Sequence, residues 1–416
     1  MGISYAFIPF LSFVRSYGSS ERDECSDVMT LHRISFLLLP PILFPMGPIQ
    51  RSERLKSADV LRGILILGVV FVHMLMLGKV VDSTRSVSLF IQPPYLGLMG
   101  FFVITGYFIP SGSYAQRVGK RLKLLMALVV CSIVLPVAMY LWLWVLGQPS
   151  TVDDLWLSIV ASFGNQNLFE PLSVPNPNKV CFSAYAQYFL WVIFWAFLIL
   201  YAIADRVLAD LRLFAVTLIV LLASEAFLVF MDMRLPFYAT LFPIAVAFML
   251  AGAFLSRRRY LEGLEVAGWR SPRTWAPLVL SVCALVVLVY LFPPGARFNF
   301  SDFGEYGGMS AFPFFVEGML VFVVLSYVSV LVARIPLLSD AIALCGKHCL
   351  ALALLHVFVV RVVLALFYTM PDDLVFPPLP AVQMVMLGVF DVVLIVAVCV
   401  LIDRKRAGRS GPASDE

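Results

Sequence analysis

The chain has 416 residues, of which 61% are hydrophobic and only 13% charged, and its mean hydropathy is +0.93. Because a soluble domain carries roughly 25% charged residues, this composition excludes a soluble globular protein and also a collagenous, coiled-coil or disordered one. The net charge of +4 is too small and too dispersed to indicate nucleic-acid binding. The apolar surface must face lipid, so the sequence predicts a polytopic membrane protein in contact with the bilayer.

Ten apolar runs are long enough to cross the bilayer as helices, which takes about 20 residues each. They are rich in Phe, Val, Leu and Ala and lack the two-residue alternation of barrel strands. The predicted fold class is therefore all-α, a polytopic membrane bundle of about ten transmembrane helices. The predicted spans are 59–80, 89–110, 121–146, 182–204, 211–231, 236–256, 274–293, 309–332, 341–368 and 378–402.

The basic residues in the loops and at the flanks of these spans are distributed unevenly between alternating segments. One set of segments carries 19 Lys and Arg residues and the other set carries five. Because basic residues accumulate on the cytoplasmic side of membrane proteins, we place the richer set in the cytoplasm. With ten spans, both termini are then cytoplasmic.

The first fifty residues hold no complete span. Their apolar run 34–44 is short and is interrupted by Pro40 and Pro41. We expect a disordered or membrane-surface extension, or a start codon assigned upstream of the true one at Met46. The predicted organisation is an extension at 1–50, a membrane-embedded domain at 51–403 and a cytoplasmic tail at 404–416.

Two ionisable residues of the first span, Arg62 and His73, are the strongest functional candidates. They are eleven residues apart, so they project from nearly the same helix face, about 16 Å apart along the axis. Ionisable groups inside a span are costly and indicate function by default. A neutral imidazole can accept a proton from a hydroxyl, and a guanidinium can hold a phosphate or a developing oxyanion. Asp59 lies one turn from Arg62 and could pair with it. The alternative to a functional role is that Arg62 reaches lipid phosphates while His73 bonds to the backbone of a neighbouring helix.

Several motifs make the chain similar to the integral-membrane acyltransferases known as acyltransferase family 3. The first span resembles the family's opening D-x-L-R-G, followed by a histidine after R-x10-H, and the second span resembles F-F-x-x-S-G-[YF]-F. A basic stretch R-x-x-R-L and a late G-x-x-S-x-x-I-Y-L-L-H motif are matched more loosely. Cys349 and Ala353 stand where the late motif usually has serine and tyrosine. In order, the matching segments are Asp59–Gly63 with His73, Phe101–Phe108, Arg117–Leu122 and Gly346–His356.

The resemblance implies ten spans and an O-acyltransferase of the bacterial inner membrane. Such an enzyme moves an acyl group, expected to be acetyl from acetyl-CoA, to a hydroxyl of a sugar, glycan or lipid-linked saccharide. His73 and Arg62 would then be catalytic, and acyl-CoA would be a substrate, with no bound cofactor. Arg117 and Arg121 are expected to hold the CoA phosphates, and Tyr107 becomes a candidate substrate contact.

The other polar groups within the spans have more than one interpretation. His356 and Arg361 could contact substrate or bridge helices. Glu317 could pair with Arg361, which we favour, or line the cavity. We find no spacing typical of metal ligands, so no metal site is predicted, and no nucleotide-binding loop or G-x-S-x-G elbow. The oligomeric state is not predicted.

Two other functions compete with acyl transfer. Intramembrane His, Arg and Glu residues are also normal in a transporter or flippase of a polar or lipid-linked substrate. Transporters often contain internal repeats, however, and this chain shows none. A related membrane protein that keeps the D-x-L-R-G motif without transferase activity is the third possibility.

Overall fold

The computed structural model describes residues 55–77, 94–110, 112–148, 150–163, 188–231, 233, 235–267, 272–291, 311–368 and 379–409. All of them belong to one compact unit. The predicted extension at 1–50 lies outside these residues.

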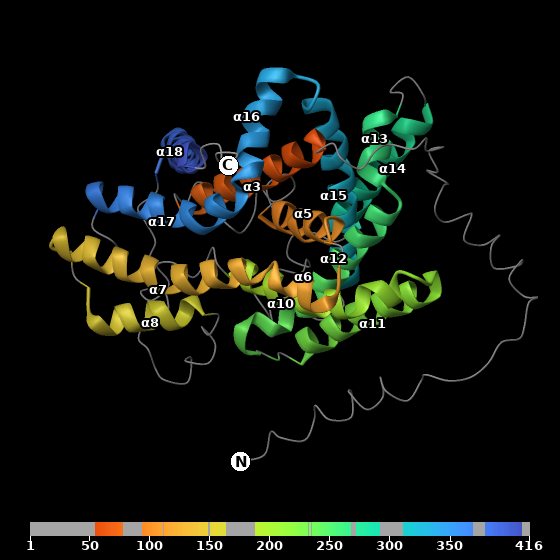
Figure 1. The fold of residues 1–416 in the computed structure, drawn as a ribbon, viewed down its shortest axis with the longest axis horizontal. Helices are drawn as coiled ribbons and strands as arrows, with labels where there is room; N and C mark the ends of the chain where they lie inside the picture. The colour runs from red at the N-terminus through yellow and green to blue at the C-terminus, as the bar shows by residue number, and fades with distance from the viewer. Residues whose placement is uncertain are drawn as a thin grey trace, which may run out of the picture. The chain divides into compact units, whose positions relative to one another are not determined.

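The described residues form helices and no strand, which confirms the all-α class (Figure 1). In chain order the helices are α3 (Lys56–Leu77), α5 (Pro94–Tyr107), α6 (Tyr114–Gly119), α7 (Leu122–Val145), α8 (Val152–Ser162), α10 (Tyr188–Val207), α11 (Leu211–Phe230), the 3-10 helix η4 (Pro236–Leu241), α12 (Phe242–Arg257), α13 (Tyr260–Val266), α14 (Pro272–Leu291), α15 (Ala311–Val332), α16 (Pro336–Lys347), α17 (Cys349–Phe367) and α18 (Ala381–Arg409).

Seven helical segments within the described residues are long and apolar enough to cross a membrane. They coincide with seven of the ten predicted spans and lie at 114–145, 189–207, 211–230, 238–257, 311–332, 349–367 and 381–406. The predicted span at 274–293 corresponds to α14, whose apolar part is shorter. The first two predicted spans, 59–80 and 89–110, correspond to α3 and α5, and their parts at 78–80 and 89–93 lie outside the described residues. Helix α5 ends at Tyr107, three residues before the predicted end of the second span. The total of ten stays a prediction.

The predicted span 341–368 is wrong in its boundaries, because the chain forms two helices there. α16 ends at Lys347, and α17 begins at Cys349 after the non-helical His348. The polar side chains of Lys347 and His348 lie at this helix junction. The Lys347 ammonium is 3.0 Å from the Asp403 carboxylate of α18. If residues 341–368 formed one continuous helix, these polar side chains would lie within the membrane span.

Helix α8 was not predicted, because its 11 residues are too few for a span and lie between two predicted ones. It packs against α7 and is fixed at its C-terminal end. The Ser162 carbonyl accepts hydrogen bonds from the Ser132 hydroxyl of α7 at 3.3 Å and from the Trp191 indole of α10 at 2.9 Å. Buried helix-end carbonyls need such partners, so the C-terminal end of α8 is anchored to α7 and α10, while side chains such as Val152 and Trp156 stay exposed.

Helix α3 lies at the centre of the described bundle and packs against α5, α15, α16, α17 and α18 (Figure 1). Its crossing with α16 is a backbone contact between two glycines. A Cβ at Gly63 would collide with the Ile342 carbonyl of α16, and a Cβ at Gly346 would collide with the Asp59 carbonyl of α3. Small residues allow helices to approach this closely in membranes, so the glycines fix the position of α3.

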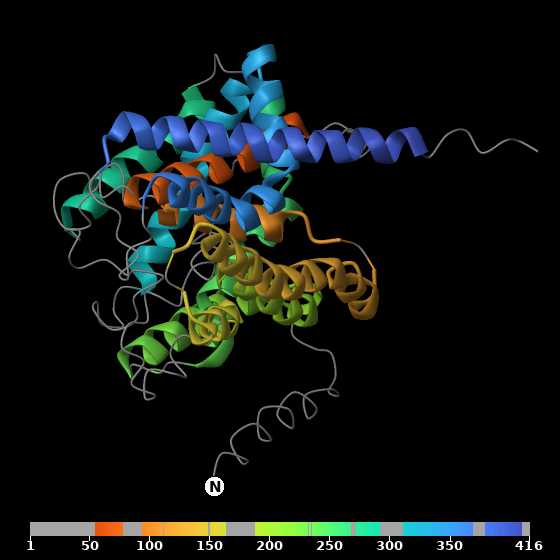
Figure 2. The same cartoon turned by 90° about the vertical axis from the view of Figure 1, so that its left-hand side faces the viewer.

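The outer helices present apolar side chains to their surroundings. Only Leu222, Glu225 and Val229 of α11 are buried, whereas every residue of α12 from Ile244 to Ala253 is buried. Helix α18 extends past its neighbours in Figure 2 and continues beyond residue 404, where we predicted the tail to begin. The chain is therefore an integral membrane protein with a buried centre and a lipid-facing rim.

Candidate active site

Two histidines from distant parts of the chain meet in the centre of the bundle. His73 lies in the last two turns of α3, and His356 lies in the second turn of α17. The distance between His73 Nδ1 and His356 Nε2 is 3.0 Å, and the rings are 5.1 Å apart. His356 is fully buried, whereas His73 is partly exposed. The two imidazoles therefore form one hydrogen-bonded pair.

The second nitrogen of His356 determines which ring atoms carry protons. His356 Nδ1 lies 2.7 Å from the Leu352 carbonyl oxygen, which can only accept a hydrogen bond. A neutral imidazole has one donor and one acceptor, so His356 Nε2 is an acceptor. His73 Nδ1 must then be the donor of the 3.0 Å bond. This assignment leaves the lone pair of His73 on Nε2, the position from which a base acts.

A buried arginine accompanies the histidine pair. Arg361 is 3% exposed and lies close enough to His73 for its charge to act on the imidazole. His356 and Arg361 are five residues apart and point in different directions on α17. Both are nevertheless buried, because α17 packs against α3, α7 and α18. The deep site therefore combines two imidazoles with one cation.

Arg62 occupies a different environment near the beginning of α3. Its Nη1 lies 3.2 Å from Asp59 Oδ1, which confirms the predicted pairing within one turn of the helix. Its guanidinium carbon lies 4.5 Å from the ring centre of Phe108, a cation–π contact. The thiol of Cys349 is close enough for the charges of Arg62 and Asp59 to act on it. The beginning of the late motif, Gly346–His356, therefore lies beside the Asp59–Gly63 motif of α3.

Tyr107 holds the short helix α13 against this end of the bundle. Its hydroxyl donates a hydrogen bond to the Glu262 carboxylate and accepts one from the Leu261 backbone N–H at 3.1 Å. Glu265 of the same helix accepts a hydrogen bond from the Ser57 backbone N–H at 3.1 Å. We predicted that Tyr107 contacts substrate, but in the structure its hydroxyl forms hydrogen bonds with Glu262 and Leu261.

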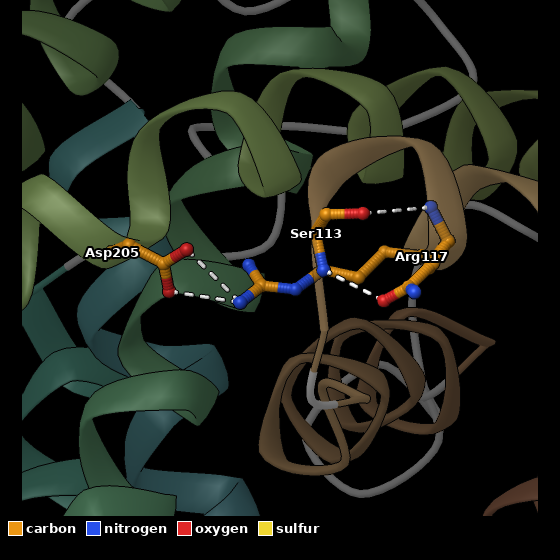
Figure 3. A network of polar contacts seen from close by, with 4 residues as sticks. Ser113, Arg117 and Asp205 are labelled. Carbon is orange, nitrogen blue, oxygen red and sulfur yellow. Dashed lines mark hydrogen bonds and ion pairs between the residues drawn. The ribbon is translucent and has the colours of Figure 1, made fainter.

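Arg117 and Arg121 both face α10. Arg117 is buried and forms an ion pair with Asp205 at 2.9 Å, just after the Ser113 cap of α6 (Figure 3). Arg121 donates a hydrogen bond to the Tyr201 hydroxyl at 2.9 Å, and its guanidinium carbon lies 4.0 Å from the ring centre of Phe197. The two arginines thus lie together, on protein partners rather than on an open surface.

Glu317 is the last of the predicted site residues. It lies in the second turn of α15 and is partly buried. Its pairing with Arg361 stays a prediction.

The structure divides the predicted site residues into three groups. His73, His356 and Arg361 form the deep site, Arg62 and Tyr107 lie at the beginning of α3, and Arg117 and Arg121 lie against α10. Sequence reasoning missed the pairing of the histidines and the anchoring role of Glu262. Within the described residues, no group of three or more His, Cys, Asp or Glu side chains could hold a metal ion.

Comparison with known families assigns the class of the protein. A model described as an acyltransferase domain, that of acyltransferase family 3, matches residues 55–404, and the chain therefore belongs to this family. The protein is thus a membrane acyltransferase. Neither a search of curated proteins nor one of solved structures finds a match.

Proposed function

We propose that the protein moves an acetyl group from acetyl-CoA to a hydroxyl of a sugar, glycan or lipid-linked saccharide. The observation that carries the proposal is the hydrogen-bonded series from the Leu352 carbonyl through His356 to His73. Such a series is the arrangement of a base held by a second group, which activates hydroxyl nucleophiles in unrelated enzymes.

The reaction needs one proton acceptor and one proton donor. His73 Nε2 would take the proton of the acceptor hydroxyl as its oxygen attacks the thioester carbonyl. The resulting imidazolium would keep its Nδ1–H on His356, whose acceptor nitrogen stabilises the charge. When the carbon–sulfur bond breaks, His73 would return the proton to the CoA thiolate. The products are the O-acetyl ester and CoA, and the histidine is neutral again.

The charge of Arg361 supports a second role in this step. Attack on the thioester places a negative charge on the carbonyl oxygen, and a positive group in a water-poor site stabilises that charge more strongly than it would in water. Arg361 is buried close to His73. We therefore assign oxyanion stabilisation to Arg361 rather than to Arg62.

Arg62 is better placed for the other end of the donor. It lies roughly 16 Å from His73 along α3 by helix geometry, and CoA carries its phosphates and its thioester at opposite ends of an extended arm. Arg62 could thus hold phosphate while the thioester reaches His73. Arg117 and Arg121 would join Arg62 only by exchanging their present partners, Asp205 and Tyr201, for phosphate oxygens. If Arg121 makes this exchange when the donor binds, Arg121→Ala should raise the donor KM with little change in kcat.

The proposed location of the reaction rests on the orientation predicted from the basic residues. With Arg62 at the cytoplasmic end of the first span, the donor would enter from the cytoplasm of a bacterial inner membrane. The acceptor would then approach His73 from the opposite side. A glycan or lipid-linked saccharide exported to that side fits this route.

The test uses the purified protein in lipid nanodiscs, with radiolabelled acetyl-CoA and a panel of envelope glycans and glycolipids. We expect label to appear as an alkali-labile ester on one acceptor class, and His73→Gln to abolish the transfer. His348→Gln is the matched control, because it is the same substitution at the α16–α17 junction. Normal transfer by a well-inserted His73→Gln protein would refute the mechanism and leave the family assignment in place.

A further inference from the structure

A shallow hollow lies where α6 joins α7, and the proposed acyl-transfer mechanism uses none of the residues that line it. It has a volume of about 700 Å³ and is lined by Gln116, Gly119, Lys120 and Lys123. All four residues are exposed. A Cβ at Gly119 would meet nothing within 4 Å, so this part of the hollow is open.

The hollow has the charge of an anion site. Lys120 and Lys123 bring two ammonium groups to it, and none of the described residues that line it carries a carboxylate. Gln116 uses its side-chain oxygen to accept a hydrogen bond from the Ser113 N–H at 3.0 Å, so its amide hydrogens remain available as donors. A phosphate group matches two ammonium groups and an amide donor.

The surface next to the hollow is apolar and exposed. Leu122, Met126, Val130 and Val134 of α7 are each at least half exposed, and they recur at four-residue spacing along the membrane-spanning helix. At 100° per residue, Lys123 is within about 20° of Val130 and Val134. The hollow therefore lies at the end of a helix face that meets acyl chains.

We propose that this hollow binds the headgroup of an anionic phospholipid. The phosphate would lie between Lys120 and Lys123, and the acyl chains would follow the apolar face of α7. Basic pockets at the cytoplasmic ends of membrane helices bind such headgroups. The CoA phosphates are the other source of the same chemistry, but a donor must reach the bundle interior, and Arg117 and Arg121 face α10 on the inner side.

The experiment measures retained lipid on the full chain. Protein from nanodiscs containing phosphatidylcholine and phosphatidylglycerol is extracted in mild detergent and examined by native mass spectrometry. We expect phosphatidylglycerol to be retained, and the double variant Lys120→Gln/Lys123→Gln to lose about tenfold of this retention. Lys405→Gln is the control, because it removes an exposed lysine from the end of α18.

A second variant tests whether the lipid needs the open space of the hollow, rather than the charge of its two lysines. Gly119→Leu would place an apolar side chain in the hollow at a position where a Cβ meets nothing within 4 Å, and it should also reduce phosphatidylglycerol retention. Equal retention by the native protein and both variants would overturn the proposal. So would a tenfold rise of the Kd for CoA in the double variant with lipid retention unchanged, because the hollow would then belong to the donor. The lipid result does not depend on acyl transfer.

Discussion

The two ends of α3 provide opposite chemical environments on a single helix. At the beginning, Arg62 is charged, ion-paired with Asp59 and covered by Phe108. Near the end, His73 donates a hydrogen bond to a second imidazole. A full charge in the membrane interior is costly, whereas a neutral imidazole is tolerated there and can still act as a base. On the proposed mechanism, α3 binds the donor's charge at one end and moves protons at the other.

The largest expected effect is at the deep end. His73→Ala and His73→Gln should each lower kcat by about 10²–10⁴-fold, because neither side chain can take a proton in this pH range. Turnover of the best acceptor, measured at equal levels of inserted protein, checks this. If His73 only bridged helices, Gln would preserve the hydrogen bond and much of the activity.

The next effect concerns the partner histidine. His356→Ala removes a hydrogen bond that would stabilise charged His73, worth about 1.5–3 kcal/mol, which corresponds to about a 10- to 150-fold loss of kcat. The donor KM should hardly change. His356→Gln should recover part of the loss, because its amide oxygen can accept the His73 Nδ1–H. Equal damage from Ala and Gln would indicate a packing role instead.

The position of α3 itself is open to test. Gly63→Ala should lower stability by about 1–3 kcal/mol, because the added methyl group meets the Ile342 carbonyl. Gly68→Ala, on the same helix, has nothing within 4 Å and should be neutral or slightly stabilising. Thermal unfolding in detergent compares them, and similar melting temperatures would contradict the close crossing of α3 and α16.

The smallest effect is expected at the beginning of α3. Tyr107→Phe removes the hydroxyl that binds Glu262 and the Leu261 N–H, at a cost of about 1–3 kcal/mol. Because α13 would loosen beside Arg62, we expect a higher donor KM and a nearly unchanged kcat. A large fall in kcat with unchanged KM would show that Tyr107 acts in the chemical step.

Local features of the chain were predictable, and distant contacts were not. Apolar length predicted the seven helical segments that the structure supports as spans, and one turn of spacing predicted the Arg62–Asp59 pair. The short helix α8 was not predicted, because its 11 residues are too few for a membrane span. The break between α16 and α17 at His348 was not predicted, because the sequence on both sides of it is apolar. His73 and His356 were separate candidates, since nothing local indicates a contact across 283 residues.

That separation has a consequence for how the protein is made. At about 5–20 residues per second, the ribosome would synthesise His356 roughly 15–60 s after His73, given the 283 intervening positions. The hydrogen-bonded histidine pair therefore cannot form until α17 has been translated and inserted. On the proposed mechanism, an incomplete chain would consume no acyl-CoA, and any truncation before α17 would yield an inactive membrane protein.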